Sequence, residues 1–128
     1  MPLHCALYFI IIVFLNSGYE KYCDDSDFDD TSPDWKGPGW YRLTGEAGTR
    51  IPEKTPDSSH CGSQYSGWMD GVHPTTPGEQ AVATICFDQG FDDCYDPVSI
   101  TVINCGDFFL YELPTAPWCY YRYCGSLV

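Results

Sequence analysis

The sequence predicts a mainly β protein: a small, disulfide-stapled domain on a twisted β-sheet, rich in loops and with little helix. Three observations lead to this fold class. Apolar residues come in short β-branched runs or alternate with polar ones, and no segment has convincing helical periodicity. Ten prolines and twelve glycines punctuate these runs. Eight cysteines in 128 residues are dense enough for a disulfide framework.

Residues 1–18 have the composition of a secretory signal peptide. Their apolar run, residues 6–15, is followed by small polar residues. A helix that spans a bilayer needs about 20 apolar residues, so no membrane anchor is expected. No Lys or Arg precedes the run, and the alternative interpretation is a buried N-terminal strand. Removal of a signal peptide would take Cys5 away with it.

Residues 19–38 are acidic and poor in aliphatic side chains, so we expect an exposed N-terminal segment. Three aspartates at every second position imitate the start of a calcium loop. Asp30 stands where that loop needs Gly, however, and Lys36 where it needs a bidentate Glu. No Cys-x-x-Cys pair exists for zinc. The sequence therefore predicts no metal site.

Strand patterns dominate from residue 39 onward. Alternation in residues 40–43 places Trp40 and Arg42 on one side of a strand, with Tyr41 and Leu43 on the other. The short β-branched run 81–87 and the alternating segment 98–103 predict two more strands.

A hairpin is predicted where residues 98–103 meet the second apolar segment, residues 108–113. Gly106 allows the turn between them. Residues 52–59 and 71–78 are rich in Pro, Thr, Ser and Gly, and we expect loops there.

Charge and motif content exclude several function classes. The net charge of −12 argues against nucleic acid and anionic lipid as partners, because both bind basic surfaces. Neither Ser63 nor Ser66 lies in a Gly-x-Ser-x-Gly elbow, and His60 beside Cys61 would need a free thiolate where the framework needs a bridge. We therefore predict no enzyme, no catalytic residue and no cofactor.

Six sequence blocks, in this order and spacing, resemble the eight-cysteine domain of the uromodulin-like glycoproteins. The blocks are GWYRLTGEAGTRIP, HCG, SGWMDGVHP, ATICF, VINCGDFFLYEL and CYYRYCG, at residues 39–52, 60–62, 66–74, 83–87, 102–113 and 119–125. The resemblance begins near Cys23 and covers most of the chain after the predicted signal peptide. We assign the cysteine-rich domain itself to residues 39–128.

The resemblance also implies a disulfide pattern. It pairs Cys23 with Cys119, Cys61 with Cys124, and Cys86 with Cys94. Each bridge would stabilise the fold by about 2–4 kcal/mol. Cys105 is left unpaired, because its counterpart in the family lies upstream of Cys23, in a segment that this chain lacks. A shortened N-terminus, a buried inert thiol and a bridge to another chain all remain open explanations.

The resemblance implies a secreted, extracellular, non-catalytic module that binds a protein or a glycan, in host defence or at a mucosal or matrix surface. The expected ligand contacts are Trp40, Arg42, Trp68 and His73. Structural interpretations also exist. Arg42 is either a ligand anchor stacked on Trp40 or, structurally, the partner of a nearby carboxylate in an ion pair. For Trp68 and His73 the structural interpretation is a turn in residues 66–74 whose aromatic side chain packs inward.

Two further expectations concern assembly and modification. No Asn-x-Ser/Thr acceptor is present, so the N-glycan decoy role of relatives does not transfer. We expect a monomer rather than a disulfide-linked dimer. The alternative function is a purely structural matrix or mucus component, or a fragment of a larger multidomain surface glycoprotein.

Overall fold

The computed structural model describes residues 3–6, 9–12, 37–44, 49–54, 65–88, 92, 94–114 and 121–123. These residues form one seven-stranded sheet and one 3-10 turn, Leu3–Ala6. The strands are β1 Phe9–Ile12, β2 Gly39–Thr44, β3 Tyr65–Asp70, β4 Gln80–Asp88, β5 Tyr95–Asn104, β6 Phe109–Leu113 and β7 Tyr121–Tyr123. The predicted mainly β fold class is confirmed. Within the described residues, no helix is long and apolar enough to cross a membrane.

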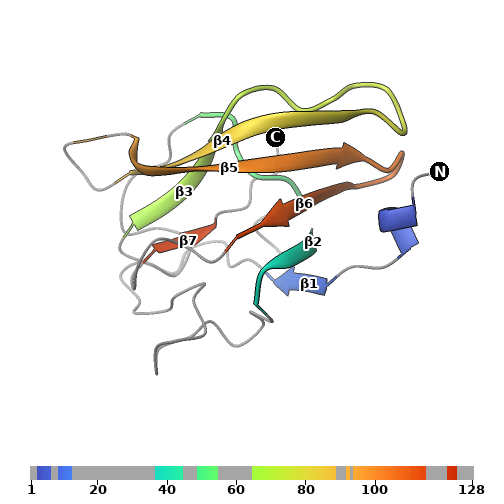
Figure 1. Ribbon diagram of the computed structural model, residues 1–128, viewed down its shortest axis with the longest axis horizontal. Coiled ribbons are helices and arrows are strands. Elements are labelled where there is room, and N and C mark those ends of the chain that lie inside the picture. The colour runs from blue at the N-terminus through green and yellow to red at the C-terminus, as the bar shows by residue number, and fades with distance from the viewer. Residues whose placement is uncertain are drawn as a thin grey trace.

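The strands lie in the order β1-β2-β6-β5-β4-β3-β7 (Figure 1). The five central strands pair antiparallel, whereas β1 joins β2 and β7 joins β3 in parallel. The long ladder between β4 and β5 runs through the middle of the sheet, and the loop from β3 to β4 covers one end of it.

The predicted hairpin is formed by β5 and β6. Asn104 pairs with Phe109, and the N–H of Cys105 donates to the carbonyl of Phe108 across the turn. Gly106 has a φ of +90°, a left-handed conformation that glycine adopts without steric cost. Its N–H donates to the Oδ1 of Asn104 at 2.8 Å, which closes the turn.

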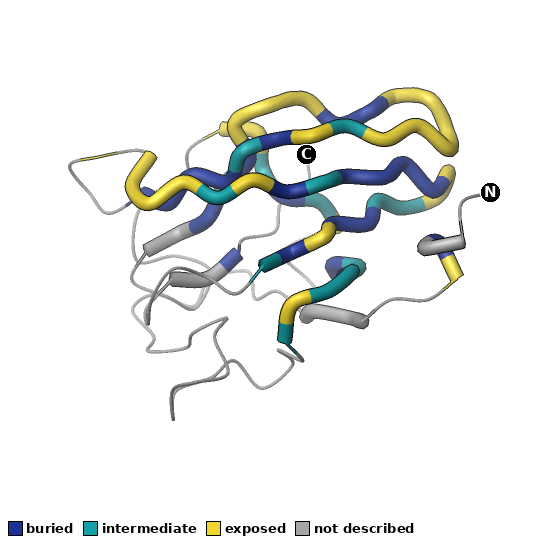
Figure 2. Tube along the Cα trace, viewed as in Figure 1, coloured by how far each residue is buried: buried dark blue, intermediate teal, exposed yellow. Residues whose placement is uncertain are grey.

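Alternation along the strands gives the sheet two different faces. One face carries the main core, which includes Tyr41 and Leu43 of β2, Ile85 and Phe87 of β4, and Tyr111 of β6. Figure 2 shows buried stretches along the inner parts of β4, β5 and β6, whereas the β3–β4 loop is mostly exposed. The predicted sidedness of residues 40–43 is confirmed, because Tyr41 and Leu43 are fully buried while Trp40 and Arg42 are half-buried.

The second face carries a smaller apolar cluster near the hairpin. Cys5, Ile103, Cys105 and Leu110 are buried there, and Trp40 and Phe108 pack against them. This cluster holds the N-terminal 3-10 turn against the sheet.

The expectation that Cys105 lacks a partner is wrong. Cys105 forms a disulfide with Cys5, 100 residues away in the sequence. Residues Phe9–Ile12 pair with β2, as in the alternative of an N-terminal strand. A short apolar run has the same composition in a signal peptide and in a buried strand, so composition alone did not separate them. The cleavage boundary at residue 18 stays a prediction.

The second described disulfide joins Cys86 at the end of β4 to Cys94 just before β5, which is a pair that the family resemblance implies. The other two implied pairs, Cys23–Cys119 and Cys61–Cys124, lie outside the described residues, as does the acidic segment up to residue 36.

Residues 66–70 differ from expectation. They were expected to form a turn, but they belong to β3, in which Trp68 lies opposite Cys86 and Gly67 opposite Phe87. Pairing with the long strand β4 outweighs the turn preference of the glycines, since strand propensity depends strongly on context. The loop begins only at Gly71.

Candidate functional site

A pocket of about 500 Å³ opens where the β5–β6 turn meets two loops, residues 49–54 and 72–75. The turn contributes Asn104 and residues 106–109 to its wall. A volume of this size lies within the range of small-molecule sites. The walls combine two phenylalanine rings with hydroxyl, amide, carboxylate and guanidinium groups.

The first loop is anchored by Ile51 and Pro52. Ile51 is fully buried, and its N–H donates to the hydroxyl of Tyr111 at 3.0 Å. The carbonyl of Pro52 accepts from the N–H of Met69 at 2.8 Å. These contacts hold the neighbouring Arg50 and Glu53 at the pocket wall.

The second loop is anchored by Asn104, at the end of β5. Its side-chain amide donates to the carbonyl of Pro74 at 2.9 Å. Its backbone carbonyl accepts from Gly78, and its N–H donates to the carbonyl of Glu79. One buried residue thus connects the hairpin turn to the loop that follows β3.

A hydrogen-bonded network links His73 to both loops. The His73 residue is 5% exposed. Its Nδ1 and its backbone N–H both contact Oε2 of Glu53, and its Nε2 lies 2.7 Å from the hydroxyl of Tyr111. One proton arrangement satisfies every group: Ile51 N–H donates to the Tyr111 oxygen, the Tyr111 hydroxyl donates to Nε2, and Nδ1–H donates to Glu53.

The pKa shifts agree with this arrangement. Burial lowers the pKa of His73, and the opposing influence of Glu53 does not overcome it. The hydrogen bonds from His73 lower the pKa of Glu53, the side-chain bond more than the backbone one. Burial raises the pKa of Tyr111. At neutral pH the network therefore consists of a neutral imidazole, an ionised carboxylate and a protonated phenol.

This network is suited to holding the pocket in shape rather than to acid–base chemistry. Both ring nitrogens of His73 are engaged, and the phenol is buried. A general base needs reach to a proton on a substrate. Among the described residues, no group of three or more His, Cys, Asp or Glu side chains is placed to hold a metal ion.

At the hairpin, the guanidinium of an arginine lies over each of two successive phenylalanine rings. Arg50 lies over the ring of Phe109, 4.7 Å from its centroid, and Arg42 lies over Phe108 at 4.1 Å. Phe109 packs on the main core and Phe108 on the second cluster, and both line the pocket. Cation–π contacts of this kind help to hold each guanidinium beside its ring.

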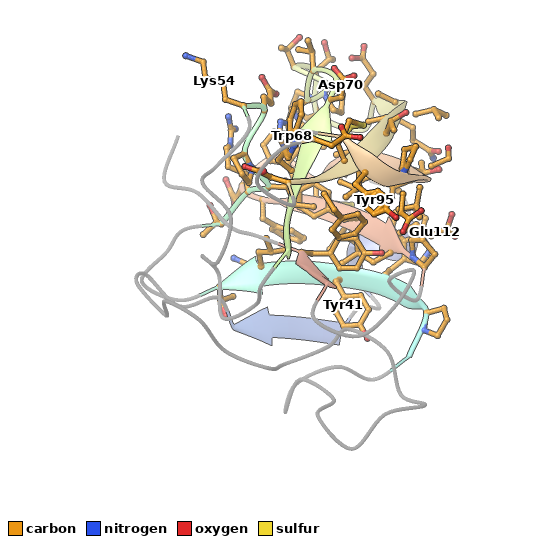
Figure 3. All side chains as sticks on the ribbon, turned by 90° about the vertical axis from the view of Figure 1, so that its left-hand side faces the viewer. Tyr41, Lys54, Trp68, Asp70, Tyr95 and Glu112 are labelled. Carbon is orange, nitrogen blue, oxygen red and sulfur yellow. A yellow bond between two sulfur atoms is a disulfide. The ribbon has the colours of Figure 1, made fainter. Side chains whose placement is uncertain are left out.

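The four ligand contacts expected from the sequence are not gathered in one place. His73 lines the pocket. Arg42 adjoins it, since its guanidinium lies over the ring of Phe108, which lines the pocket. Trp40 packs into the second cluster, and Trp68 stands on β3 (Figure 3). Neither tryptophan lines the pocket. Their role as ligand contacts stays a prediction.

Sequence reasoning missed the pocket residues Arg50, Glu53 and Asn104, and the supporting Tyr111. Alternation does place Phe109 and Tyr111 on one side of the predicted strand. Nothing local indicates that residues 49–54 fold over that side, since the contact between Ile51 and Tyr111 spans 60 positions.

Comparison with known proteins supports the similarity seen in the sequence blocks. The family model of the uromodulin-like eight-cysteine domain matches residues 41–125. Human pancreatic secretory granule membrane major glycoprotein GP2 is 32% identical over 87 residues, which is 67% of this chain and 16% of the relative. Mouse uromodulin is 32% identical over 87 residues, covering 67% of this chain and 14% of the relative. The dog GP2 glycoprotein is 33% identical over the same length and is covered to 17%. The matched part thus spans about one sixth of these relatives.

Proposed function

Because this chain belongs to the family of uromodulin-like eight-cysteine domains, we propose that it is an extracellular, non-catalytic module that binds a carbohydrate or protein partner. The pocket at the β5–β6 turn is the observation that carries the proposal, since it combines aromatic and polar groups on an anchored frame. Carbohydrate is the partner class that its chemistry favours.

An extracellular location is supported by the cysteine chemistry. Two disulfides are present in the described residues, and such bridges persist in oxidising compartments. Eight cysteines in 128 residues fit the same environment. One relative is named for a secretory granule membrane.

The pocket lining suits a sugar. Aromatic rings can cover the apolar C–H face of a pyranose, while carboxylate and hydroxyl groups bond its hydroxyls. Phe108 and Phe109 line the pocket, and because a guanidinium lies over each ring, a sugar would meet only the uncovered parts of these rings. Asp107, Thr49 and Thr75 offer the polar groups. Non-catalytic binding accords with the buried network, whose groups already bond one another.

A glycan array probed with the purified full chain tests this function. Thr75→Trp fills the pocket from an exposed wall position, and Thr76→Trp places the same side chain on the adjacent exposed position outside the lining. We expect wild type and Thr76→Trp to give signals that free glycan competes away, and Thr75→Trp to lose them. An array without any competable signal would support the structural matrix role instead.

A further inference from the structure

We propose that the pocket binds a sugar that carries a carboxylate, of the uronic-acid or sialic-acid type, and that Arg50 anchors the acid group. The inference rests on the proposed carbohydrate-binding function and adds the ligand class. It begins from the state of the Arg50 guanidinium.

Arg50 is positioned to accept an anion. Its guanidinium lies over the ring of Phe109, and in the part of the chain that the structure describes no carboxylate forms an ion pair with it. No hydrogen bond of the guanidinium is seen among those residues either, so its five N–H donors are available. Among the lining residues that the structure describes, Arg50 is the one cationic side chain, and it is half-buried.

Glu53, a carboxylate of the same wall, is engaged elsewhere. Its Oε2 receives two hydrogen bonds from His73, one from the ring and one from the backbone. The charge of Arg50 contributes to lowering the pKa of Glu53, but only as a minor influence after the bonds from His73. Arg50 therefore keeps its capacity for a bidentate partner, and a planar carboxylate matches its geometry.

The remaining wall favours a sugar over an acidic peptide. Asp107 lies in the same pocket as Arg50 and would repel a second acid group, whereas it can accept hydrogen bonds from sugar hydroxyls. The exposed hydroxyls of Thr49 and Thr75 add further partners for such hydroxyls. One acid group flanked by hydroxyls fits this distribution of charge.

The net charge of the chain helps to distinguish specific binding of an anion at the pocket from unspecific electrostatic attraction. A chain with a net charge of −12 repels anions at long range. Salt screens that repulsion beyond about 8 Å at physiological ionic strength, but it screens a half-buried contact much less. Binding of an acidic sugar must therefore come from the local contact with Arg50.

The experiment measures the Kd of matched ligands for the full chain by titration calorimetry at physiological ionic strength. The probes are methyl glucuronide and the methyl glycoside of N-acetylneuraminic acid. Methyl glucoside, which has a CH2OH in place of the acid group of methyl glucuronide, is the neutral control. N-acetyl-aspartate amide presents a carboxylate without a sugar.

Arg50→Gln removes the charge and keeps a polar side chain, and Lys54→Gln removes one positive charge from the same loop outside the pocket. We expect Arg50→Gln to weaken binding of an acidic sugar about tenfold or more, which is about 1.4 kcal/mol. Arg50→Lys should lose part of that affinity, because it keeps the charge without the planar fork. Lys54→Gln should bind as wild type does.

Three results would overturn the inference. They are equal affinity for glucuronide and glucoside, equal losses in Arg50→Gln and Lys54→Gln, and binding of the aspartate derivative as tight as that of the acidic sugars. The first two, combined with array signals that Thr75→Trp abolishes, would leave carbohydrate binding intact and refute the acid-specific anchor alone. If the wild-type chain gives no competable signal on the array, the carbohydrate binding on which this inference rests is itself refuted.

Discussion

Tyr111→Phe should be strongly destabilising although it removes a single oxygen atom. The phenol is fully buried, accepts from the N–H of Ile51 at 3.0 Å and lies 2.7 Å from Nε2 of His73. Phenylalanine leaves both of these groups without that partner. A buried polar group that loses its hydrogen bond costs about 1–3 kcal/mol, so two such groups cost about 2–6 kcal/mol. This loss is a large share of the free energy of unfolding of a whole domain, which is about 5–15 kcal/mol.

Urea unfolding at neutral pH, with disulfides intact, measures this loss. Tyr123→Phe removes a hydroxyl that donates to one carbonyl, that of Pro114, and should cost about 0.5–1.5 kcal/mol. Tyr95→Phe changes an exposed side chain and should stay within about 0.5 kcal/mol of wild type. The urea dependence should be equal in all variants, so that differences in midpoint report stability.

A double-mutant cycle with His73→Phe isolates the hydrogen bond between the two residues. The new ring can keep the packing on Phe109, whose centroid lies 4.6 Å from that of His73. We expect a coupling of about 1 kcal/mol between positions 73 and 111. If Tyr111→Phe costs no more than Tyr95→Phe, or if the cycle shows no coupling, the described network does not support the pocket.

Three other predictions follow from pKa shifts, disulfides and core packing. The pKa of His73 is lowered in the folded state, so the neutral imidazole contributes its full share to the free energy of unfolding above the ordinary value of 6.5. That share is lost as the pH falls from 6.5 towards the folded pKa. Urea midpoints should therefore drop over that range in wild type, and drop less in His73→Phe. Replacing both cysteines of the Cys5–Cys105 bridge with alanine should cost about 4.7 kcal/mol for its 100-residue separation, against about 2.5 kcal/mol for the Cys86–Cys94 bridge of separation 8; equal losses in thermal unfolding would contradict the chain-entropy explanation. Ile85→Ala, at a fully buried site on β4, should cost about 2–5 kcal/mol in the same assay, whereas Val82→Ala on the exposed side of the strand should be nearly neutral.

The strands and the hairpin could be predicted because their signals are local. Alternation in residues 40–43 and 98–103, and Gly106 between two apolar segments, gave the right elements and the right sides. Residues 66–70 could not be assigned in this way. Their strand depends on pairing with β4, and a segment with glycines at positions 67 and 71 reads equally well as a turn.

Of the residues that line the pocket, only His73 could be predicted from the sequence as a site residue. The partners of His73 come from positions 53 and 111, which no periodicity connects, and the sheet order determines that they meet. The disulfide between Cys5 and Cys105 could not be predicted for a related reason. Its N-terminal half lies beside an apolar run whose composition also suits an export signal.

The two outermost strands of the described sheet are short: β1 has four residues and β7 has three, and both run parallel to their neighbours. An edge strand exposes unpaired N–H and C=O groups, with which a strand of another molecule can pair to begin a fibre. A short edge strand limits such pairing. Copies of this domain crowded at high concentration should therefore resist strand-by-strand aggregation, which would keep their ligand pockets individually accessible.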